Sequence, residues 1–220
     1  SSPVSSLPTE SPTPDENTFT LEHVLKDGTI ETSKDSEAIN INFIGGYDGN
    51  TDSDAIAIAD YWVYTYRNGA GSVSEWNQKK STNTIDATDG YTIKGPGRPQ
   101  NYTFVGTPND GELTTRVGGE QSYLLGNPYP SAISAKKFIE DNSNAIKDGT
   151  LYFWQHAGEE DSTSSETAGH NFAGYVGGYA TLNLTMGVPA GKAADESNLD
   201  DGNDNTPSVG NGNYDEPKNW

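Results

Sequence analysis

The sequence predicts an all-β protein, an antiparallel β-sandwich or jelly roll with one short helix and long acidic loops. Runs such as EAININFI at residues 37–44 alternate apolar and polar side chains, which is the period of a strand with one buried face. Similar runs return about every ten residues and are separated by Gly, Pro and Asn-Asp-Gly turns, a spacing typical of many short antiparallel strands.

The chain divides by composition into three parts. Residues 1–18 are rich in Ser, Pro, Thr and Glu and are predicted to be a linker or tether. Residues 19–190 hold the strand patterns and form the expected β-sandwich module, beginning with strands at 19–24 and 37–44. Residues 191–220 are acidic and almost without apolar side chains, so we expect a loop-like tail that leads to a missing strand.

The longest strand signal is AIAIADYWVYTYR, Ala55–Arg67. Apolar and aromatic side chains occupy both of its faces, which indicates a central strand covered on both sides, with a bulge at Asp60 where the pattern changes face. The alternative is a platform of exposed rings that stacks on sugars. Shorter strands are expected at 75–76, 90–94, 101–106, 112–117, 122–125, 150–155 and 178–184, with a hairpin turn at 109–111.

A rigid corner follows the apolar run at Tyr123–Leu125. In the segment GNPYPS each proline fixes its own φ and pushes the preceding residue out of the α region. Ser131 or Ser134 can then cap a short helix over Ala135–Asn142. Turn chemistry explains every residue here, so a buried corner is favoured over a ligand site.

Five short segments occur in a fixed order between residues 57 and 189: GYTIKGPG (90–97), NYTFVGTPNDGEL (101–113), YLLGNPYPSAI (123–133), GTLYFWQH (149–156) and GGYATLNLT (177–185). Together they resemble a module of very large secreted surface proteins of Bacteroidota, many of which use the type IX secretion system. The resemblance implies a secreted, β-rich module with a structural or adhesive role. It implies no catalytic residues. Such modules usually continue into a further strand, which we expect from a longer chain or from another chain.

Charge and composition exclude several classes of function. The formal net charge is −19, with 13 Lys and Arg against 32 Asp and Glu, so nucleic acid is not an expected partner. No run approaches the length of a membrane span, and membrane insertion is not expected. The sequence contains no cysteine, which excludes disulfides and thiolate metal sites. A protein of this composition suits the cell exterior, with cations as its natural counterpart.

Two acidic segments are candidate calcium sites. Alternating Asp and Asn oxygens in a tight loop are the hard ligands that calcium prefers, although the same residues also favour plain turns. The first segment lacks the glycine and the bidentate Glu of an EF-hand loop. The first set is Asp48, Asn50, Asp52 and Asp54, and the second is Asp200, Asp201, Asn203 and Asp204.

These observations predict an extracellular structural or adhesive module, stabilised by calcium, whose partners are other surface-protein chains, copies of itself or glycans. The alternative is a carbohydrate-binding module with ring platforms at Trp62, Tyr64, Trp76 and Trp154. No catalytic motif is present, and we expect no enzyme activity. A glycoside-hydrolase carboxylate pair is the remaining enzymatic alternative, since only geometry identifies such a pair.

Overall fold

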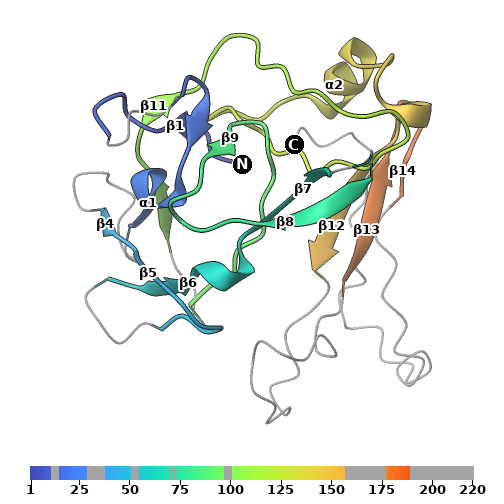
Figure 1. The fold of residues 1–220 in the computed structure, drawn as a ribbon. Helices are drawn as coiled ribbons and strands as arrows, with labels where there is room; N and C mark the ends of the chain where they lie inside the picture. Colours follow the sequence, from blue (N-terminus) through green and yellow to red (C-terminus); the bar gives the residue numbers. More distant parts are fainter. Residues whose placement is uncertain are drawn as a thin grey trace, which may run out of the picture. The chain divides into compact units, whose positions relative to one another are not determined.

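The computed structural model describes residues 1–10, 15–28, 38–50, 55–69, 71, 73–96, 101–156 and 177–188. The chain forms two compact units, Ser1–Ala132 (unit 1) and Ile133–Trp220 (unit 2), where one module over 19–190 was expected. Most described elements are strands in two- and three-stranded sheets, so the all-β class is confirmed (Figure 1). The sandwich stays a prediction.

Unit 1 contains most of the strands. β3, β4 and β10 form a three-stranded sheet, and the pairs β1–β11, β2–β9 and β7–β8 are antiparallel, whereas β5 and β6 run parallel. The bounds are β1 Val4–Ser5, β2 Thr18–Phe19, α1 Leu21–Val24, β3 Leu25–Asp27, β4 Ile39–Asn40, β5 Asn42–Ile44, β6 Ala57–Ala59, η2 Asp60–Trp62, β7 Tyr64–Asn68, β8 Ser74–Gln78, β9 Ile85–Asp86, β10 Tyr102–Phe104 and β11 Thr107–Pro108.

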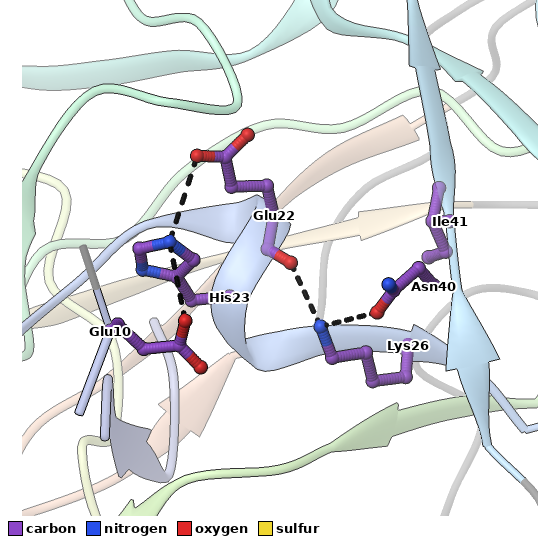
Figure 2. A pocket seen from close by; sticks show the side chains of 6 residues that line it. All are labelled: Glu10, Glu22, His23, Lys26, Asn40 and Ile41. Carbon is purple, nitrogen blue, oxygen red and sulfur yellow. Dashed lines mark hydrogen bonds and ion pairs between the residues drawn. The ribbon is translucent and has the colours of Figure 1, made fainter. Parts of the chain in front are cut away.

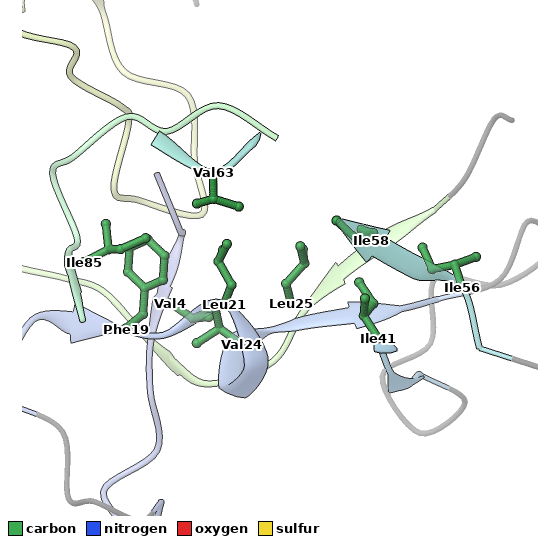
Figure 3. Packing of buried hydrophobic residues seen from close by; sticks show 10 residues of the cluster. All are labelled: Val4, Phe19, Leu21, Val24, Leu25, Ile41, Ile56, Ile58, Val63 and Ile85. Atoms are coloured by element: carbon green, nitrogen blue, oxygen red, sulfur yellow. The ribbon is translucent and has the colours of Figure 1, made fainter. Parts of the chain in front are cut away.

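One hydrophobic core holds unit 1 together (Figure 3). Its ten buried residues come from short elements and the segments between them, and each contributes roughly 1.5–3 kcal/mol when its side chain is fully buried. They are Val4, Phe19, Leu21, Val24, Leu25, Ile41, Ile56, Ile58, Val63 and Ile85. The start of the expected tether is part of this unit, because Val4 belongs to the core and β1 pairs with β11.

A buried carboxylate fixes β7 against the chain that precedes the proline corner. Asp89 is only 1% exposed. It accepts hydrogen bonds from Arg67 Nη2 at 2.8 Å and from the Tyr123 hydroxyl at 2.9 Å, and Arg67 also reaches Asp86. Burial raises the pKa of the Asp89 carboxyl, and the Arg67 guanidinium acts against that rise.

The expected strand at 19–24 is wrong. Only Thr18 and Phe19 pair as β2, and α1 makes a single helical turn in which the Val24 N–H donates to the Thr20 carbonyl at 3.2 Å. A strand would point Leu21 and Val24 to opposite faces, whereas three-residue helical spacing puts both on the same side. Both are 0% exposed, so the core selects the helical turn.

The expected strand at Ala55–Arg67 is interrupted. The 3₁₀ turn η2 lies at Asp60–Trp62, where a bulge was expected, and it separates β6 from β7. Asp60 holds the turn, because its carbonyl accepts from the Val63 N–H at 3.2 Å and its carboxylate pairs with Lys80 at 3.0 Å. The two halves therefore join different sheets. Every residue of β6 is buried, whereas in β7 only Thr65 is.

Three other expected strands, 90–94, 112–117 and 122–125, are not strands in the structure. Tyr91 and Leu125 make only isolated bridges, to Thr65 and Asp89. The Asn109-Asp110-Gly111 segment turns at Gly111, with φ at +71°, but the expected hairpin is absent from the described residues around it. The Asn109 amide instead donates to the carbonyls of Ser2 and Pro128, which brings the N-terminal segment to the corner.

Unit 2 consists of a helix and one antiparallel sheet. Its elements are α2 Ala135–Asp141, η4 Lys147–Gly149, β12 Leu151–His156, β13 Gly177–Leu182 and β14 Gly187–Val188, with sheet order β12-β13-β14. The predicted helix is confirmed, and Ser134 caps it by accepting from the Lys137 N–H at 3.3 Å. Ile139 on α2 is 1% exposed.

Candidate functional site

One face of the β12–β13–β14 sheet carries large exposed rings. Tyr152 lies opposite Thr181, and Trp154 lies opposite Tyr179, so the four side chains share a face. Tyr152 is 68% exposed, Trp154 53% and Tyr179 60%. The rings of Trp154 and Tyr179 meet edge to face, with centroids 5.1 Å apart. We call this surface the unit 2 aromatic face.

The alternation of the two strands creates this arrangement. Leu151 and Phe153 on β12 and Ala180 and Leu182 on β13 point to the opposite face, where all four are half-buried. Val188 on β14 pairs with Thr181 and extends the aromatic face. Among the side chains that the structure describes, the members of the aromatic face are Tyr152, Trp154, Tyr179, Thr181 and Val188, and none of these carries a formal charge.

The β7–β8 ribbon in unit 1 repeats this pattern. Tyr66 lies opposite Trp76, their ring centroids are 4.9 Å apart, and Trp76 is 56% exposed. Tyr64 pairs with Gln78 and shares the face. The ribbon's charged residues belong to the other face. We call this surface the unit 1 aromatic face, and its members are Tyr64, Tyr66, Asn68, Ser74, Trp76 and Gln78.

Trp62 lies in a different setting. Its indole Nε1 donates to the Tyr47 carbonyl at 2.7 Å, and its ring contacts Tyr61 edge to face with centroids 5.0 Å apart. The Lys94 ammonium lies 5.6 Å from the ring centroid, a cation–π arrangement. The cluster holds the Tyr47 loop against η2, so Trp62 is already engaged within the protein.

The first predicted calcium loop is only partly described. Asp48 pairs with Lys94, and Asn50 exchanges backbone hydrogen bonds with Ala57. Asp52, Asp54 and the whole second set (Asp200, Asp201, Asn203, Asp204) lie outside the described residues. Within the described ranges, no cluster of three His, Cys, Asp or Glu side chains has the geometry to hold a metal. Calcium stays a prediction.

A polar pocket lies beside α1 (Figure 2). Its centre is His23, whose Nε2 lies 3.7 Å from a carboxylate oxygen of Glu10 and 3.7 Å from one of Glu22. Lys26 donates to the Glu22 carbonyl and to Asn40 Oδ1, each at 2.9 Å. Burial lowers the Lys26 pKa, and the two carboxylates act against this.

Two carboxylates, those of Glu10 and Glu22, are among the residues that line this pocket. The two dashed contacts leave the His23 ring nitrogen in opposite directions, so the imidazole stands between Glu10 and Glu22 (Figure 2). In a glycoside hydrolase the space between the two carboxylates must hold the scissile bond and, in inverting enzymes, a water molecule. The arrangement is better suited to tying the segment that contains Glu10 to α1.

Some of the exposed rings were predicted from the sequence and others were not. Trp76 and Trp154 are exposed, each beside a tyrosine that was not singled out, namely Tyr66 and Tyr179. Tyr152 was also missed. The signal was available, since LYFWQH and GGYATL alternate with period two, but alternation alone does not tell which face is covered.

Comparison with known proteins places the chain in a family but does not indicate an activity. No curated protein and no solved structure matches the chain. Among the residues that the structure describes, no helix combines the length and apolarity needed to cross a bilayer. Residues 47–203, which include both aromatic faces, match the family described as Domain of unknown function (DUF8693), and the chain belongs to that family.

Proposed function

We propose that this protein is an extracellular adhesive module of a bacterial surface protein and that it binds uncharged polysaccharide through the unit 2 aromatic face. The observation that carries the proposal is the exposure of three rings on one uncharged face of a sheet, at Tyr152, Trp154 and Tyr179. Exposed apolar patches of this kind mark interaction sites.

The chemistry of the face suits a neutral sugar. The flat C–H face of a pyranose packs against an aromatic ring, whose own face carries partial negative charge, while hydroxyls at the sugar edge remain in water or bond to groups such as Thr181. The net charge of −19 disfavours acidic polymers, because a polyanion would be repelled over long range.

Affinity electrophoresis tests the proposal. The full chain runs through native gels that contain β-glucan, galactomannan or dextran, with alginate as the acidic control. We expect retardation in at least one neutral polymer and not in alginate, and clearly weaker retardation in Trp154→Ala. Leu184→Ala is the matched control, since Leu184 is also 53% exposed but lies in the turn after β13. Migration unaffected by all three neutral polymers would contradict the proposal.

A structural role within an assembly is the second candidate. The observation that favours it is the exposure of Leu184 and Met186 in the β13–β14 turn, which leads to the exposed Val188 of the aromatic face. Contiguous apolar surface also suits contact with another surface-protein chain or with a copy of this one. Sedimentation velocity separates the candidates, because self-association that Met186→Ser weakens, without retardation in polysaccharide gels, favours assembly.

Calcium completes the proposal as a stabiliser of the acidic loops. A ligand that binds only the folded state raises the unfolding temperature. We expect EDTA-stripped protein to unfold at a higher temperature when calcium is added at fixed ionic strength, and magnesium to have little effect. Equal midpoints in calcium, magnesium and EDTA would remove calcium from the account.

A further inference from the structure

Unit 1 contains a second surface with the chemistry of the proposed binding face. On the β7–β8 ribbon, Tyr64, Tyr66 and Trp76 share one face, and Trp76 is 56% exposed. We infer that this unit 1 aromatic face is a second binding site for uncharged polysaccharide, so that the chain holds one polymer at two points. This inference rests on the proposed function and extends it from one unit to both.

The distribution of charge across the ribbon identifies the class of ligand. In the register of the ribbon, Arg67 lies opposite Glu75, and both point to the other face. The aromatic face holds only rings, carboxamides and a hydroxyl, from Tyr64, Tyr66, Asn68, Ser74, Trp76 and Gln78. In a chain of which 20% is charged, a face without charge that combines rings with amides matches a neutral sugar better than a peptide or an ionic ligand.

The two faces also share their central feature, a cross-strand Trp–Tyr pair. The ring planes are inclined by 53° in Tyr66–Trp76 and by 71° in Trp154–Tyr179, with centroids about 5 Å apart in both. The Trp62 cluster, whose indole nitrogen is bonded inside the protein, lacks such a presentation. Within the residues that the structure describes, each unit therefore offers one exposed tryptophan on an antiparallel pair of strands.

Two sites on one chain should raise the affinity for long polymers above the affinity for short oligosaccharides. A polymer repeats its sugar unit, so once one face is occupied the second meets a high local concentration of the same ligand. A short oligosaccharide that occupies a single face gains nothing from the second site. The chain should therefore prefer long polymers over the oligosaccharides from which they are built, by roughly 10²-fold.

The experiment compares four proteins: the unmodified chain, Trp76→Ala, Trp154→Ala and the double variant. Isothermal titration measures binding of β-glucan, galactomannan and dextran, and of cellotetraose, mannotetraose and isomaltotetraose. Val73→Ala is the matched control, because Val73 is 58% exposed beside the same ribbon but lies outside the aromatic face. Trp76→Tyr keeps a ring at the position and should retain most of the polymer affinity, which guards against a folding artefact.

We expect two sites per chain for the tetrasaccharide of the polymer that binds, one site in either single variant and none in the double variant. Polymer affinity should fall by roughly 10²-fold in each single variant. If Trp76→Ala leaves polymer affinity and stoichiometry unchanged while Trp154→Ala abolishes both, the second site is overturned and the proposed function stands. If none of the three neutral polymers binds the unmodified chain, both fail.

Discussion

The core of unit 1 and the aromatic face of unit 2 use the same kinds of residue in opposite ways. In unit 1, Phe19, Leu21 and Ile58 are 0% exposed and lie inside one core (Figure 3). In unit 2, Tyr152, Trp154 and Tyr179 lie on the outside of a three-stranded sheet. The buried side chains of the unit 1 core supply stability. The three exposed rings of unit 2 contribute little to folding, so their surface is available for binding.

The largest expected effect is on the unit 1 core. Ile58→Ala removes a fully buried side chain and leaves a cavity, so we expect a loss of about 4 kcal/mol in the free energy of unfolding. Ile39→Ala is the control, since Ile39 is 39% exposed and its loss should have little effect. Urea unfolding followed by circular dichroism measures both, and equal losses would contradict the assignment of Ile58 to the core.

The second largest effect on stability is expected at the buried ion pair between Arg67 and Asp89. Arg67→Met leaves the Asp89 carboxylate buried without its counter-charge, and we expect a loss of about 3 kcal/mol at neutral pH. Asp86→Asn is the control, because Asp86 is half exposed and its pair contributes at most about 1 kcal/mol.

Acidic pH should reduce the loss in the free energy of unfolding that Arg67→Met causes. Burial raises the Asp89 pKa in the folded protein, and removing Arg67 takes away the main opposing charge. A carboxyl whose pKa is higher in the folded state binds protons more readily when folded, so falling pH favours folding. Urea unfolding at mildly acidic pH should therefore show a smaller deficit than at neutral pH. A deficit that grows in acid would contradict the assignment of Asp89.

A smaller effect is expected at the helix of unit 2. Ser134→Ala removes the side chain that caps α2 and should reduce stability by about 1 kcal/mol. Ser134→Asp keeps a capping oxygen and should restore it. Amide hydrogen exchange at residues 135–141 follows this helix directly. Unchanged exchange in Ser134→Ala would mean that the cap has no role.

The smallest effect is expected on the unit 2 aromatic face. Tyr152 is 68% exposed, so Tyr152→Ala should change the free energy of unfolding by no more than about 0.5 kcal/mol. Thermal unfolding measures the change. A loss as large as that of Ile58→Ala would show that the ring is covered in solution.

Local patterns predicted the elements whose neighbours in sequence determine them. The α2 helix follows from Ser134 and the proline corner, and β12 and β13 follow from period-two alternation. The failures share a cause, which is packing with distant residues. The core selects a helical turn at Leu21–Val24, and Asp60 with Lys80 divides the predicted strand 55–67.

The candidate site was predicted only in part, because packing with distant residues also decides which rings are exposed and which meet. Alternation assigns Trp154 and Tyr152 to one face of β12 but does not say which face is covered. Tyr179 becomes a neighbour of Trp154 only through the pairing of β12 with β13. Likewise, Asp48 is a candidate calcium ligand by sequence, whereas in the fold it meets Lys94, which lies far from it in the chain.

Hydroxyl-radical footprinting of the full chain, with and without the neutral polysaccharide that retards it, shows whether the rings of unit 2 are exposed and bind the polymer. We expect rapid oxidation of Tyr152, Trp154 and Tyr179 in the free protein, slow oxidation of Phe19, and protection of the three exposed rings when polysaccharide is present. Slow oxidation of those rings in the free protein, or equal oxidation with and without polysaccharide, would contradict the proposal.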